Sequence, residues 1–238
     1  MSKQTEELVK LHYPVIAPLL MGAGVGDGKT TMCVMAQAAC IDALRKGKTL
    51  ETPTDNMACA CPVLRRTAIR LNDTNWWKDN AERTEILRPI IPLLFDSRGD
   101  QALTARRMFF VADHAVRVIT PMRVEWIVEN RPKQQDRLQP WLDAIRKIQP
   151  ITDKASALVA RDLCREMRDA AVAYADAAAA AVAADAAAAV YAAAAAAAAV
   201  YAAYAAYAAD ADENKIFQQK LKYRTSLLEC FYACAALK

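Results

Sequence analysis

The sequence has no glycine or proline after Pro150 and only two histidines, His12 and His114. Glycine and proline end helices most reliably, so the last part of the chain is expected to hold long, unbroken helices. Neither histidine adjoins a serine or cysteine in a nucleophile motif, and Cys59-Ala60-Cys61 lacks the C-x-x-C spacing of common zinc sites. We therefore expect no catalytic residue, no metal and no cofactor, which favours a non-enzymatic protein without excluding an enzyme.

Charge of one sign and targeting signals are also scarce. The formal net charge of +4 is too small to require a nucleic-acid partner, although it is compatible with an anionic ligand. Met1 is followed by a polar segment rather than a signal peptide, and the number of cysteines, seven, is odd. This pattern predicts a cytoplasmic protein whose reduced thiols pack as small apolar side chains.

Large aliphatic residues are nearly absent from the uncharged run 186–209, although this run is long enough to span a bilayer. It offers only Val190 and Val200, together with four tyrosines, and no basic residue flanks it directly. Insertion into a membrane depends on Leu, Ile, Phe and Val. The sequence therefore predicts an alanine-rich helix outside the membrane.

This run belongs to a longer segment, 170–211, in which alanine is interrupted almost only by Asp, Val and Tyr. We expect one long helix over 151–209, and helical spacing places its larger side chains in one stripe. A stripe on a small-residue helix favours close packing, so we predict a homo-oligomer assembled through Val182, Val190, Val200, Tyr201, Tyr204 and Tyr207.

The remaining chain is also expected to be helical. The polar break at 210–214 precedes a C-terminal helix over 213–238 and would allow an antiparallel helical hairpin. Residues 1–150 are expected to form a globular helical domain, and strand signals are weak. The fold class is therefore all-α, with domains 1–150 and 151–238. Within the first domain, helices are predicted over 31–46, 62–71, 79–95 with a kink or a division into two shorter segments at its prolines, 101–119 ending before Pro121, 122–129 and 134–148.

A glycine-rich segment near the N-terminus satisfies the loose form of a phosphate-binding loop, with Ala23 in place of the first glycine. The element before it contains two prolines, which suit a buried parallel strand badly. A P-loop-like nucleotide-binding phosphohydrolase is therefore an alternative reading, and its phosphate would be bound by Gly24, Gly26, Gly28, Lys29 and Thr30.

Arginines cluster in two helical segments of the N-terminal domain. Two adjacent helices would present these guanidinium groups as a basic pocket for phosphate or carboxylate, with a tryptophan nearby to stack on a base. The simpler alternative is that the arginines pair with neighbouring acidic residues and that the tryptophan belongs to the core. The predicted anion-binding residues are Arg65, Arg66, Arg70, Arg106, Arg107, Arg117 and Trp76.

Three segments carry a resemblance to known proteins: Met32-Cys33-Val34-Met35-Ala36, Cys61-Pro62-Val63-Leu64-Arg65-Arg66, and Ile69-Arg70-Leu71-Asn72-Asp73 with Trp76. Together with the Ala/Tyr/Asp composition of the tail, they resemble alanine-rich proteins of bacteriophages and prophages whose function is unknown. The resemblance covers residues 30–125, and it brings no established activity and no catalytic residue. It implies a small accessory protein that acts in the bacterial host cytoplasm.

The leading hypothesis is a phage-type binding protein, for example one that counters a host defence. Such a protein would sequester a host protein or an anionic small molecule such as a nucleotide. The alternatives are the phosphohydrolase described above and a structural alanine-rich rod.

Overall fold

A computed structural model describes residues 33–48, 56–74, 76–130, 135–173 and 213–238. Every regular element in these ranges is helical and none is a strand, which confirms the predicted all-α fold. No helix in these ranges combines the length and the apolar character needed to cross a membrane. The chain divides into two compact units, residues 1–104 and 105–238. Each unit is described by itself.

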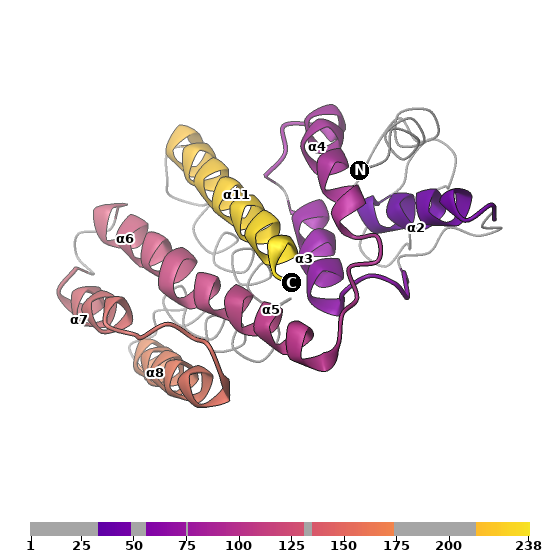
Figure 1. Cartoon of the computed structure of the whole chain (residues 1–238). Helices are drawn as coiled ribbons and strands as arrows, with labels where there is room; N and C mark the ends of the chain where they lie inside the picture. Colours follow the sequence, from indigo (N-terminus) through magenta and orange to yellow (C-terminus); the bar gives the residue numbers. More distant parts are fainter. Residues whose placement is uncertain (1–32, 49–55, 75, 131–134, 174–212) are drawn as a thin grey trace. The chain divides into compact units, whose positions relative to one another are not determined.

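In unit 1, helix α2 (Val34–Arg45) is buried over most of its length (Figure 1). Its first turn is fixed by the Cys33 thiol, which accepts a hydrogen bond from the Ala36 N–H at 3.3 Å. Its end forms a Schellman motif, because the N–H groups of Gly47 and Lys48 donate back to the last turn. Gly47 has a φ of 70°, which explains why the helix stops at the glycine that the sequence marked.

Helices α3 (Pro62–Asp73) and α4 (Asn80–Leu87) also follow the sequence signals. Pro62 occupies the first turn of α3, where its missing N–H has no helical acceptor to lose. The Asp79 carboxylate caps α4 by accepting from the Glu82 N–H at 2.8 Å. The predicted run divides into shorter segments at its prolines, since α4 ends at Leu87 and a 3₁₀ helix, η1 (Arg88–Leu93), follows it. Helix α2 packs against α3 and η1.

Unit 2 begins within helix α5 (Gln101–His114). The π-helical segment η2 (Ala115–Ile119) and helix α6 (Thr120–Asn130) follow α5 without a break (Figure 1). The expectation that Pro121 ends the helix is wrong. A wider π turn lies directly before the proline, where the Thr120 N–H bonds to the Ala115 carbonyl. A π turn contains one residue more than an α-helical turn, which makes room for the proline ring and removes the need for a hydrogen bond from the proline nitrogen. The helix therefore continues past Pro121.

Two further helices of unit 2 follow, α7 (Gln135–Arg146) and α8 (Lys154–Ala173). Helix α7 packs on α6 through one apolar cluster, and α8 packs on α5 and η2 through another. The first cluster contains Val124, Ile127, Leu138 and Leu142. The second contains Ala112, Val116, Ile151, Ala157, Ala160 and Cys164.

Helix α11 (Glu213–Ala236) lies antiparallel to the path of α5, η2 and α6. Hydrogen bonds place Cys234 at Arg107, Ser226 at His114 and Gln219 at Met122. The hydrogen-bonded residues of α11 therefore have decreasing residue numbers as those of α5 and α6 increase, which is the pattern of antiparallel helices. The two compact units divide after Thr104, and α11 packs on helices that precede residue 150. The predicted domains, 1–150 and 151–238, stay a prediction.

Candidate functional site

The predicted arginines of unit 1 lie on one helix, α3. Arg66 and Arg70 are both exposed and stand one helical turn apart on the same face. Arg65 is half-buried and donates to the Asn56 side-chain oxygen at 2.9 Å. Neither Arg66 nor Arg70 has an ion pair or hydrogen bond with any residue in the part of the chain that the structure describes. Arg66 and Arg70 are thus the exposed members of the three predicted arginines on α3.

The predicted arginines of unit 2 are engaged within that unit. Arg107 is only 4% exposed and donates to the carbonyls of Cys234 and Leu237 at 3.2 and 2.9 Å. Arg106 donates to the backbone oxygen of Lys238. Arg107 thus closes the carbonyl end of α11, where backbone acceptors lack helical donors.

Arg117 pairs with Asp113 one turn earlier, with its Nη1 at 3.1 Å from a carboxylate oxygen. The same carboxylate accepts from the Ile151 N–H at 2.8 Å and so ties α5 to the segment that precedes α8. This pair matches the simpler alternative that the sequence left open for the arginines.

Trp76, the predicted stacking residue, is 1% exposed and belongs to the core of unit 1. Its ring therefore has no free face for a base in this structure. Two other sets of predicted residues lie outside the described residues: the glycine-rich segment with Gly24, Gly26, Gly28, Lys29 and Thr30, and the stripe formed by Val182, Val190, Val200, Tyr201, Tyr204 and Tyr207.

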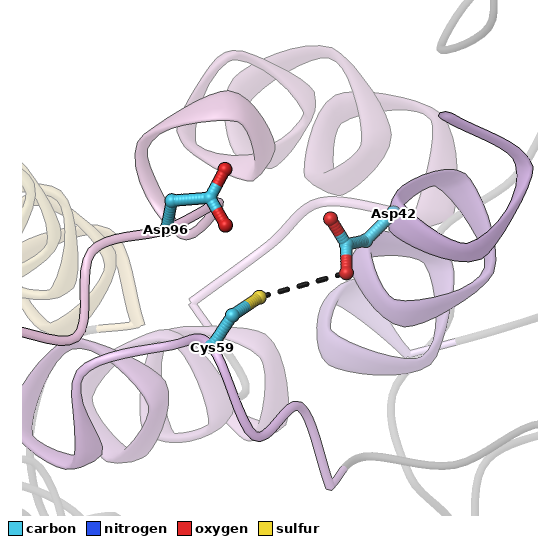
Figure 2. A group of neighbouring side chains, drawn as sticks. All are labelled: Asp42, Cys59 and Asp96. Carbon is cyan, nitrogen blue, oxygen red and sulfur yellow. Dashed lines mark hydrogen bonds between the residues drawn. The ribbon is translucent and has the colours of Figure 1, made fainter. Parts of the chain in front are cut away.

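A second group of polar side chains in unit 1 was missed by sequence reasoning. Asp42, Cys59 and Asp96 converge from α2 and from two turns, and their ligand-type atoms lie within 4.8 Å of one another (Figure 2). The Cys59 thiol donates to an Asp42 carboxylate oxygen at 3.5 Å. Asp96 stands at a φ of 50°, a left-handed conformation that Asp tolerates better than most residues.

Two basic side chains already balance the charge of this group. Arg45 bridges both carboxylates, at 2.9 Å from Asp42 and 2.6 Å from Asp96, and Lys46 contacts Asp42 at 2.6 Å. Burial raises the pKa of Asp42, but the hydrogen bonds from Lys46 and Arg45 outweigh it and hold that pKa below its usual value. A metal ion would have to compete with the Arg45 and Lys46 side chains for the same carboxylates. We therefore interpret the group as a set of ion pairs that joins α2 to the two turns.

Unit 2 contains a histidine and serine pair that no sequence motif marked. The His114 Nε2 lies 2.9 Å from the Ser226 hydroxyl, across the α5–α11 interface. Ser226 is 7% exposed and stands inside a helix, so a substrate would not reach it. Asp113 is engaged with Arg117 and Ile151 and does not orient the imidazole. The pair therefore resembles a catalytic dyad in distance but not in access.

These arrangements differ in how far the sequence could reveal them. The spacing of Asp42 and Lys46 suits an ion pair on one helix face. The other members come together only through tertiary packing, since Cys59 and Ser226 carry no local signal. Comparisons of the chain with protein-family models, curated proteins and solved structures found no match.

Proposed function

We propose that this chain is a non-enzymatic binding protein and that the exposed face of α3 binds the acidic surface of a partner protein. The observation that supports the proposal is the pair Arg66 and Arg70, which is exposed and has no ionic or hydrogen-bonding partner among the described residues. Like charges one turn apart on a helix destabilise it by roughly 0.2–0.5 kcal/mol. A bound anionic group would relieve that repulsion.

The local charge of α3 strengthens this proposal. Its acidic residue, Asp73, stands at the last position and accepts a hydrogen bond from the neighbouring Asn72 amide. Arg65 adds a third positive charge beside the pair, and Asn56 holds it in place. Guanidinium groups bind carboxylates with two parallel hydrogen bonds, so a row of Asp or Glu side chains is the matching partner chemistry.

The test is a titration of the full chain with poly-L-glutamate, followed by isothermal calorimetry. Arg66→Glu/Arg70→Glu is expected to abolish binding, and the wild-type affinity should fall as salt rises. Arg165→Glu provides a control, because Arg165 is an exposed arginine on α8. The control carries half the charge change of the double variant, so Arg165→Glu/Lys154→Glu is measured beside it. An equal loss of binding in that second pair would mean that only net charge matters and would overturn the proposal.

The role of a phage accessory protein in a bacterial host cytoplasm rests on the resemblance alone and stays a prediction. The structure limits which of the predicted arginines can form the binding surface, because the arginines on α5 and η2 already contact residues within unit 2. The proposed interface is therefore narrower than the sequence predicted and lies on α3 alone.

A further inference from the structure

A groove lies between the C-terminal end of α6 and the first turns of α11, entirely within unit 2. Its volume is about 390 Å³, and one wall carries Trp126, Glu129 and Asn130. The other wall carries Lys215, Gln218 and Lys222. Ligand pockets in proteins commonly measure about 300–1,000 Å³, so this groove is large enough for a small molecule.

The α11 wall of the groove is positively charged. Lys215 and Lys222 are exposed and stand two helical turns apart, which is roughly 10 Å along the axis. Neither lysine has an ion pair or hydrogen bond with a residue of the described ranges, and this includes Glu129 across the groove. Lys215 also lies in the first turn of α11, where the helix dipole adds positive potential. An anionic group between the two lysines would meet two flexible ammonium groups.

The α6 wall offers a ring and fixed polar groups. Trp126 packs partly against the apolar α6–α7 cluster, which holds its indole in place. The Asn130 amide donates to the Trp126 backbone carbonyl at 2.8 Å, so its side-chain oxygen remains as an acceptor. Gln218 is exposed and offers both a donor and an acceptor. An aromatic face beside amide groups is the combination that proteins use to stack a base and read its edge.

We infer that this groove binds a nucleoside monophosphate, with its base against Trp126 and its phosphate between Lys215 and Lys222. The groove and the α3 arginines lie in different units and share no residue. The inference therefore does not depend on the function proposed above. It assigns each part of the ligand to one wall, and each assignment can be tested separately.

The first experiment compares three probes by isothermal calorimetry with the full chain: AMP, adenosine and ribose 5-phosphate. AMP is expected to bind saturably, and the two fragments at least about tenfold more weakly, because each loses the contacts of one wall. Equal affinities for AMP and ribose 5-phosphate would mean that the groove binds phosphate without a base. That result, or no saturable binding of AMP at millimolar concentration, would overturn the inference.

The second experiment locates the site. Lys215→Gln/Lys222→Gln should weaken AMP about tenfold or more and leave the affinity for adenosine unchanged. Gln218→Glu should weaken AMP as well, because it places a negative charge between the lysines. All three positions are exposed, so equal thermal unfolding temperatures will show that the variants fold.

Two control variants complete the design. Lys154→Gln removes an exposed lysine from α8, and Arg66→Gln/Arg70→Gln removes the exposed pair of α3. Neither should change AMP binding. Loss of binding in the α3 variant, or unchanged binding in Lys215→Gln/Lys222→Gln, would contradict the assignment to the groove.

Discussion

At the scale of single residues, His114 is a mostly buried titratable group at the contact between α5 and α11. Burial lowers the pKa of His114 below its usual value, while the bond to Ser226 and the charges of Asp113 and Glu229 act in the opposite direction. The fold therefore favours the neutral imidazole. A group with a lowered basic pKa contributes stability that is present above its unfolded pKa and is lost as the pH falls below it.

We accordingly predict that the free energy of unfolding of the full chain falls as the pH drops below about 6.5, the ordinary pKa of histidine. Urea unfolding at pH 7.5, 6.5 and 5.5 measures this fall, which is at most about 1.4 kcal/mol per pH unit for one proton. His114→Gln keeps a polar side chain at the interface and should reduce the slope. A slope that is the same in this variant would show that other groups cause the pH dependence.

The candidate site residues show what a sequence can reveal at this scale. Arg117 with Asp113 and Asp42 with Lys46 are pairs one helical turn apart, and spacing alone predicts such contacts. The role of Arg107 was not predictable in this way, because its acceptors lie 127 or more residues further along the chain. The sequence also did not indicate which arginine side chains of α3 are exposed, although exposure is what distinguishes Arg66 and Arg70 from Arg65.

At the scale of elements, proline shows both the success and the limit of sequence reasoning. Pro89 and Pro92 lie in a 3₁₀ helix that follows α4, so the run divides into shorter segments at its prolines, as their missing N–H groups led us to expect. Pro121 does not end its helix, because the π turn at 115–119 precedes it. Sequence spacing does not indicate where such a turn will form, since the extra residue is stabilised by packing.

The docking of α11 on α5 leads to a prediction about two adjacent arginines. Arg107→Leu is expected to lower the free energy of unfolding by about 2–3 kcal/mol, because it leaves carbonyls at the end of α11 without a charged donor. Arg106→Leu removes a neighbouring charge from an exposed position and should cost about 0.5 kcal/mol or less. Chemical unfolding of both variants provides the comparison. Equal losses would mean that the burial of Arg107 is unimportant.

At the scale of the whole molecule, the prediction that the protein self-associates comes from the alanine-rich segment, 170–211. Its Val and Tyr stripe lies outside the described residues, so homo-oligomer formation rests on helical spacing alone. Val200→Lys/Tyr204→Lys places two charges on the stripe and should convert an oligomer to a monomer in light scattering. Helical spacing would place the charge of Ala202→Lys on the side of the expected helix opposite the stripe, so this variant should keep the oligomeric mass. A native chain that is already monomeric would contradict the prediction.

The sequence separation between α5 and α11 also leads us to expect that unit 1 forms before unit 2 during synthesis. Within unit 1, the bond from Val34 to Asn72 closes a loop of 38 residues, whereas the bond from Arg107 to Cys234 spans 127. The longer loop costs roughly 1 kcal/mol more in closure entropy. Helix α11 leaves the ribosome after α5, so the side of α5 that contacts α11 lacks this partner until α11 has been synthesised. We therefore expect the nascent chain to be open to chaperones and proteases at this stage.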